Sequence, residues 1–313
     1  MTSSSPKNLF FAYTKPENFS GQTAASELLI ELYSKESIKC IPLILYPLEN
    51  GHRSWIKACS KAVYKQFTIL SDLRKLLFNR GGILHLNLGQ SIWSFVRIGV
   101  WYFPIKVLKG NQPTVISLHG SLFMIWKENS FVMRSFKIML KSCNIVTVLG
   151  ERQKTRLVEL GIKPQKIRVV PNTCTLNLVN DSFIYNKHSS CSSVNLLYLS
   201  LLIGSKGYNT YLDSLEALSK MQLPLKVNAI LCGPITFQAN SESFRTETGK
   251  IEWIDSRIKS INNNSDNFKV DWIHGASGDM KVRLFQEAHI FVLPTRFPVE
   301  AQPIVLIEAL ASG

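Results

Sequence analysis

Two glutamates near the end of the sequence, Glu300 and Glu308, are the first candidates for chemistry. Glu308 lies in the apolar run IVLIEALA, which predicts a buried helix that begins after Pro303. An ionised carboxylate inside such a helix is costly unless a partner binds it. That partner is either an arginine or backbone amide of the protein, or a ligand with paired hydroxyl groups such as a ribose. The residues alone leave both alternatives open.

Glu300 lies between an expected strand, residues 289–294, and the helix that carries Glu308. Ligands of open α/β sheets bind beyond the carboxyl ends of the strands, so Glu300 is well placed to reach one. Glu308 lies two turns deeper. Acidic residues are also common near helix starts because the helix dipole favours them, and a purely structural role for Glu300 is the alternative.

Three further positions combine a glycine or a cationic side chain with an expected element end. Lys206 and Gly207 precede an expected helix, where a lysine beside a glycine indicates an anion site, or else an ordinary surface turn. Gly21 follows the first expected strand, where the Ser20-Gly21 pair by itself indicates only a turn. His119 ends the expected strand 114–119, a position where a lone histidine is more often structural.

The elements that must position these residues alternate between strand-like and helix-like segments, which predicts parallel sheets with helices on both faces. We expect a first Rossmann-like domain over 1–175, a polar linker over 176–193 and a second such domain over 194–313. A polar insertion is expected at about 238–266. The pattern stops at Gly313 before a second domain would be complete, so we expect a truncated domain. The expected strands are 8–13, 41–46, 83–88, 114–119, 144–149, 167–172, 194–200, 227–233, 268–273 and 289–294.

The charge and hydropathy of the chain limit the kinds of partner that it can bind. The net charge of +14 favours anionic lipid or phosphate-bearing substrates over nucleic acid, since no nucleic-acid-binding motif accompanies it, and a role in solubility alone is the alternative. No apolar run is long enough to span a membrane, and the N-terminus lacks the features of a signal peptide, so we expect a cytoplasmic protein. The aromatic and basic segment 91–110 is either a core helix and strand or a membrane-surface segment.

The string FVLPTRFPVEAQPIVLIEALASG, with two glutamates eight positions apart, resembles the signature of the family 4 glycosyltransferases. The resemblance implies a retaining enzyme of the GT-B fold, with two doubly wound Rossmann-like domains that face a cleft. It implies that Glu300 contacts the donor sugar and Glu308 the nucleotide ribose. Lys206, with the neighbouring Gly207, stands where that family binds the diphosphate. Similarity extends along the chain from Phe10 and is strongest from residue 194 onward.

Two first-domain segments also resemble that family. NFSGQTAASELLIEL resembles its glycine loop, so Gly21 would approach the diphosphate or the acceptor. LHGS matches its His-Gly pair, so His119 would contact the transferred sugar. The family implies a nucleoside diphosphate sugar as donor and a saccharide or lipid-linked acceptor, in cell-surface polysaccharide or glycolipid synthesis. The cytoplasmic protein would then attach to the inner face of the cell membrane.

The sequence also departs from the family pattern. Leu201 occupies the position of a usual arginine, and a catalytically impaired homologue that still binds nucleotide sugars is therefore an alternative. No Asp-x-Asp motif is present, which favours a metal-independent enzyme without cofactors. An NAD-dependent oxidoreductase on the same sheet type is disfavoured, because no G-x-G-x-x-G follows the first strand.

Overall fold

The chain divides into two compact units, each with its own parallel sheet. The first unit holds Met1–Thr173 and Val299–Gln302, and the second holds Cys174–Pro298 and Pro303–Gly313. The expected fold class, two doubly wound Rossmann-like sheets, is confirmed. The computed structural model describes residues 8–14, 21–45, 74, 76–78, 82–90, 92–110, 112–174, 176, 179, 181–188, 192–221, 223–236, 244 and 246–313.

The first sheet has six parallel strands in the order β2-β1-β3-β4-β5-β6. The strand order reverses beside β1, the position at which doubly wound sheets bind ligands. The strands are β1 (Leu9–Thr14), β2 (Cys40–Leu45), β3 (Ile83–Asn87), β4 (Thr114–Ser117), β5 (Ile145–Val148) and β6 (Ile167–Val169).

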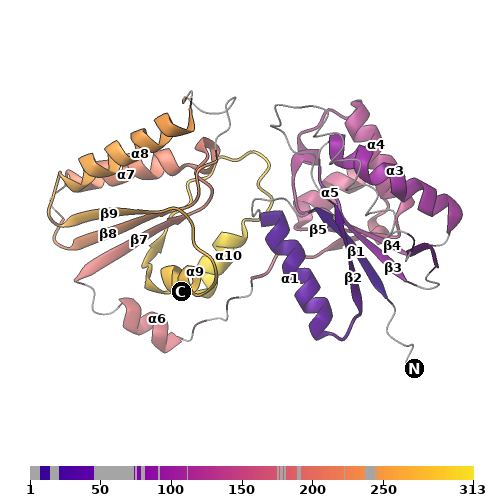
Figure 1. The fold of residues 1–313 in the computed structure, drawn as a ribbon, viewed down its shortest axis with the longest axis horizontal. Helices are drawn as coiled ribbons and strands as arrows, with labels where there is room; N and C mark the ends of the chain where they lie inside the picture. The colour runs from indigo at the N-terminus through magenta and orange to yellow at the C-terminus, as the bar shows by residue number, and fades with distance from the viewer. Residues whose placement is uncertain are drawn as a thin grey trace. The chain divides into compact units, whose positions relative to one another are not determined.

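Helices cover this sheet unevenly. Helix α1 (Gly21–Lys35) lies on the other side of the sheet from α3 (Ile92–Leu108) and α4 (Phe131–Ser142) (Figure 1). The last described α-helix of the unit, α5 (Glu151–Glu159), ends before Gly161, whose φ of 83° suits glycine. In segment 91–110, expected as a core helix and strand or a membrane-surface segment, Ile92–Leu108 form one helix.

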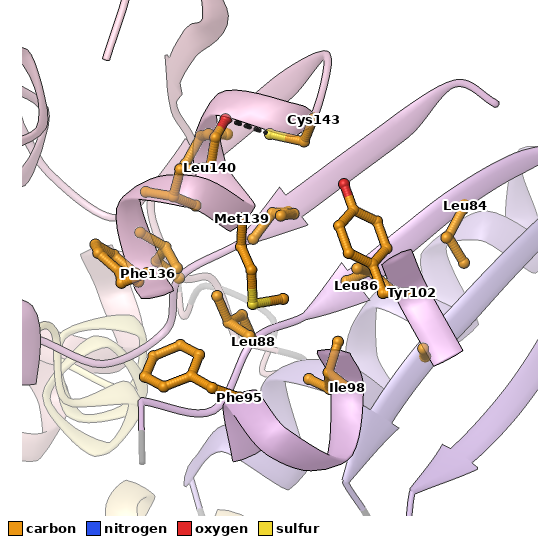
Figure 2. Packing of buried hydrophobic residues seen from close by; sticks show 14 of the residues in the cluster. Leu84, Leu86, Leu88, Phe95, Ile98, Tyr102, Phe136, Met139, Leu140 and Cys143 are labelled. Carbon is orange, nitrogen blue, oxygen red and sulfur yellow. Dashed lines mark hydrogen bonds between the residues drawn. The ribbon is translucent and has the colours of Figure 1, made fainter. Parts of the chain in front are cut away.

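The inward face of α3 supplies much of the core of the first unit. Tyr102 and Ile98 are almost fully buried, and they pack with strand β3 leucines and with Met139 of α4 (Figure 2). The opposite face of α3 exposes Val107 and Leu108. Since one face is buried and the other carries exposed apolar groups, a core role for α3 is established and its outer face remains available for other contacts.

The second sheet has four parallel strands in the order β10-β7-β8-β9, so the strand order reverses beside β7. Figure 1 shows α7 and α8 on one face of this sheet and α9 and α10 on the other. The strands are β7 (Ser193–Leu199), β8 (Lys226–Cys232), β9 (Phe268–Ile273) and β10 (Ile290–Phe291). The helices are α6 (Asp181–His188), α7 (Tyr208–Ser219), α8 (Glu247–Asn262), α9 (Gly278–Glu287) and α10 (Ile304–Ala311).

The segments expected as a linker and as a polar insertion both contain helices. The expected linker 176–193 contains α6, and its residues group with the second unit. The expected polar insertion at 238–266 contains α8, which begins at the N-cap Thr246, whose side chain accepts a hydrogen bond from the amide of Gly249. The sequence did not predict this helix, because α8 is polar at most positions and buries only a few residues, among them Ile254 and Ile261. Among the described residues, no helix is long and apolar enough to cross a membrane.

Candidate functional site

The turn after β7 carries Lys206. This turn is a short 3-10 helix, Gly204–Lys206, and α7 begins directly after Gly207. The Nζ atom of Lys206 lies 4.9 Å from the centre of the Phe297 ring, a cation–π contact. The cation and the first amides of α7 are thus at the carboxyl edge of the sheet, as the sequence predicts, in an arrangement that suits an anion.

Gly207 brings this turn against the loop that follows β10. Its φ is 81°, and a Cβ atom there would lie 2.2 Å from the carbonyl oxygen of Pro294. The amide of Arg296 donates a 2.8 Å hydrogen bond to the carbonyl of Ser205. Because β7 and β10 are neighbours at the reversal of strand order, the structure places Lys206 and the loop 294–297 together at the expected binding edge.

Glu308 is buried in α10, as its apolar surroundings predict, and only 7% of the residue is exposed. Its Oε1 accepts a 2.5 Å hydrogen bond from the Nζ of Lys281 on α9. Its Oε2 is shielded from solvent and has no hydrogen-bond partner among the described residues. Leaving a buried acceptor unsatisfied costs about 1–3 kcal/mol, so half of this carboxylate has unused binding capacity.

The structural partner of Glu308 is therefore a lysine and not the arginine or backbone amide expected from the sequence. Lys281 lies 27 residues earlier in the chain, on a separate helix. A lysine on a half-exposed helix gives no signal of such a pairing, and only the packing of α9 beside α10 reveals it.

The region around Leu201, where the resemblance implies an arginine, contains a different cation. Lys250 of α8 is fully buried, and its Nζ donates to the carbonyls of Leu202 and Thr236. It also lies 4.9 Å from the centre of the Tyr208 ring at the start of α7. This side chain links the segments that follow β7 and β8, a role that sequence reasoning missed because α8 was not expected.

Glu300 lies in the short segment Val299–Gln302, which groups with the first unit. In that segment Gln302 binds Asn172 twice: its Oε1 accepts from the Asn172 amide at 2.7 Å, and its carbonyl accepts from Asn172 Nδ2 at 2.9 Å. Glu300 and Glu308 thus fall in different units, and the structure does not place the pair relative to each other.

In the first unit, His119 follows β4 and lines a cavity of about 170 Å³ between α1 and strands β3 to β5. Neither ring nitrogen of His119 has a hydrogen bond of good geometry among the described residues. Burial lowers the pKa of His119, and nearby Asn172 partly offsets this shift. The imidazole is therefore kept neutral, with one donor and one acceptor nitrogen available.

A chain of neutral polar groups runs along the same cavity, and sequence reasoning missed it. The Tyr33 hydroxyl lies 2.8 Å from His85 Nδ1, and His85 Nε2 lies 2.6 Å from the Ser117 hydroxyl. Ser117 in turn is hydrogen-bonded to Thr147 at 2.6 Å. Burial lowers the pKa of His85 to about 3, and the nearby His119 contributes in the same direction. The linked side chains of Tyr33, His85, Ser117 and Thr147 are therefore uncharged.

Gly21 is the first residue of α1, directly beyond the β1 position at which the first sheet reverses its strand order. The structure places this glycine at a helix start, and its approach to a ligand stays a prediction. In the first unit the structure thus places Gly21 at the start of α1 and His119 just beyond the end of β4.

Comparison with protein families gives one match. Residues 49–177 match the model of Glycosyltransferase Family 4. The resemblance to that family is confirmed. The matched residues lie mostly in the first unit, whereas Lys206, Glu300 and Glu308 lie beyond them, so their roles do not follow from this match. A search of curated proteins found no match.

Comparison with solved structures shows the fold. A structure of Anabaena Alr3699/HepE in complex with UDP is 12% identical, with a TM-score of 0.60 over 97% of this chain and 78% of that chain. The apo form of the lipopolysaccharide outer core galactosyltransferase WaaB is 14% identical, with a TM-score of 0.57 over 98% and 78%. A structure described as trehalose-6-phosphate from E. coli bound with UDP-2-fluoro glucose is 9% identical, with a TM-score of 0.61 over 98% and 82%. The GT-B fold class is thereby confirmed.

Proposed function

We propose that this protein is a glycosyltransferase that moves a sugar from a nucleoside diphosphate sugar to a saccharide or lipid-linked acceptor. The observation that carries the proposal is Glu308, a buried carboxylate with one oxygen bound by Lys281 and the other without a partner in the described structure. The family match and the similarity to a UDP complex support a nucleotide sugar as the donor.

In the second unit, we assign the nucleotide to the carboxyl edge of the sheet, beside β7, where the strand order reverses. Glu308 would accept hydrogen bonds from the ribose hydroxyls. Lys206, Gly207 and the first amides of α7 would bind the diphosphate, because a cation and a helix start together favour negative charge. This charge stabilisation grows as the diphosphate leaves, so it would lower the barrier of the reaction and not only bind the donor.

For the donor sugar, we assign Glu300 to the sugar hydroxyls and His119 to the region where the sugar is transferred. A neutral His119 can donate or accept one hydrogen bond to an uncharged sugar without adding a competing charge. Gly21 would allow the backbone of α1 to approach the diphosphate or acceptor. We propose retention of configuration through a transition state with oxocarbenium character, and we assign no nucleophile.

We propose that the reaction needs no metal ion. Lys206, backbone amides and the α7 dipole would together meet the charge of the leaving diphosphate. We expect activity to survive exhaustive chelation without any addition of Mg²⁺ or Mn²⁺. Activity that is lost on chelation and restored only by a divalent cation would contradict the proposal.

We also propose that the protein acts on cell-surface polysaccharide or glycolipid precursors at a cytoplasmic membrane surface. The exposed apolar residues Val107 and Leu108 of α3, with the net charge of +14, support this location. Binding to anionic vesicles should be strong at low salt and weak at high salt, whereas no binding at low salt would remove the membrane part of the proposal.

The donor is tested with a panel of nucleotide sugars. We expect a nucleoside diphosphate to raise the melting temperature and a labelled sugar to be transferred or hydrolysed. Glu308→Gln should weaken nucleotide binding by about tenfold or more, because a charged hydrogen bond contributes about 1.5–3 kcal/mol. Stabilisation by NAD alone would support an oxidoreductase, and binding without transfer would support an impaired homologue with Leu201 as its lesion.

A further inference from the structure

The two oxygens of the Glu308 carboxylate have different environments. Lys281 Nζ lies 2.5 Å from Oε1, and the side chains of Lys281 and Glu308 are 25% and 9% exposed. Oε2 has no hydrogen-bond partner in the part of the chain that the structure describes. The protein therefore fixes one side of this carboxylate and leaves the other unsatisfied, which is unusual for a buried ionised group.

Lys281 also lies near the binding edge of the second sheet. Its charge acts on Cys232, the last residue of β8, where it partly offsets the burial that raises the pKa of that thiol to about 11. The carboxyl ends of parallel strands share one edge, so Lys281 reaches Glu308 from the side on which doubly wound sheets bind nucleotides.

The contact restricts how the carboxylate can turn. The terminal torsion of a glutamate is broad, so an unpaired carboxylate would rotate freely between orientations. With Oε1 bound to the lysine, rotation is limited and the charge is balanced. Since Oε2 is shielded from solvent, a ligand hydroxyl reaches it only after a small turn of the carboxylate or a shift of the covering atoms.

We propose that Lys281 is a positioning residue for the nucleotide: it orients the Glu308 carboxylate so that Oε2 can meet the ribose hydroxyls. This inference rests on the proposed function of the same site. Lys281 itself touches neither the ribose nor the diphosphate in this scheme. Removal of the lysine leaves the buried carboxylate without its partner, so that Glu308 rotates outward and the ribose contact is lost.

The test compares UDP with 2′,3′-dideoxyuridine diphosphate, which lacks both ribose hydroxyls, by calorimetry on the full chain. Wild-type protein should bind UDP more tightly. Lys281→Met should weaken UDP binding by about tenfold. It should leave the dideoxy compound unaffected, so that the preference for UDP disappears. Lys281→Arg, which keeps the charge, should restore part of that preference. If UDP does not bind, the same measurement is made with GDP and its dideoxy form.

The matched control is Arg283→Met, which removes the same charge from an exposed position of α9 and should change neither affinity. Lys281→Gln serves in the same comparison if the methionine variant does not fold. An unchanged UDP preference in a folded Lys281 variant, or tighter UDP binding, would overturn the positioning role while the proposed function stands. A wild-type protein that binds neither UDP nor GDP would overturn both.

Discussion

The two units present chemically opposite binding edges. In the first unit the buried polar groups are neutral: His85, His119 and their hydroxyl partners are held without charge. In the second unit they include ionisable groups with partners: Lys250 is fully buried against two carbonyls, and Lys281 is paired with Glu308. Burial excludes charge only where no partner compensates it, so the contrast fits the proposed assignment of the uncharged sugar to the first edge and of the anionic nucleotide to the second.

The largest effect is expected from acid, and it should arise in the first unit. The pKa of His85 is lowered from 6.5 to about 3, so the unfolded chain binds a proton at pH values where the folded chain does not. Stability should therefore be complete above about pH 6.5 and decrease as the pH falls, by about 3 kcal/mol between pH 7 and pH 4. Urea unfolding between pH 7 and pH 4 measures this loss of stability.

His85→Asn should flatten this pH dependence, because the asparagine has no proton to take up. His274→Asn, which changes an exposed histidine of the second unit, is the control and should leave the slope unchanged. An acid slope that is the same in wild type and His85→Asn would show that the neutral chain of the first unit does not depend on a neutral His85.

Lys250→Met should destabilise the second unit by about 2 kcal/mol, because it leaves the carbonyls of Leu202 and Thr236 without their shared donor. Thermal unfolding measures this loss. Lys259→Met, at an exposed position of the same helix, should be neutral. Equal stability of the two variants would mean that the buried cation contributes nothing beyond its apolar stem.

The smallest expected effect tests the charged edge as a diphosphate site. Lys206→Ala should weaken UDP binding by about five- to tenfold and leave uridine binding unchanged, since only the diphosphate meets the cation. Lys220→Ala, at the other end of α7, is the matched control. A similar loss for uridine and UDP would indicate damage to the turn instead of a lost phosphate contact.

Local patterns were sufficient to predict most of the fold. Apolar runs gave the strands, Gly207 marked the turn before α7, and the apolar surroundings of Glu308 indicated its burial. Strand β10 is shorter than the expected 289–294, because only Ile290 and Phe291 pair with β7 before the chain turns toward Ser205.

Contacts between distant segments could not be predicted in the same way. The link from His85 to Thr147 requires that β3, β4 and β5 be neighbours, and a single strand carries no record of that order. Lys281 and Lys250 look like ordinary surface lysines on polar helices. Their roles follow from the packing of whole helices, which the spacing of residues along one helix does not encode.

The contact at Gly207 has a practical consequence for protein engineering. A hydrogen atom is all that fits between this position and Pro294, so the two loops are already at their closest separation. Any larger residue would act as a wedge and move the Lys206 turn away from the loop 294–297. Libraries that seek altered donor preference should therefore keep position 207 fixed and vary the residues on either side. A loss of donor binding in a variant at position 207 would reflect the changed distance between the loops and not a changed contact with the donor.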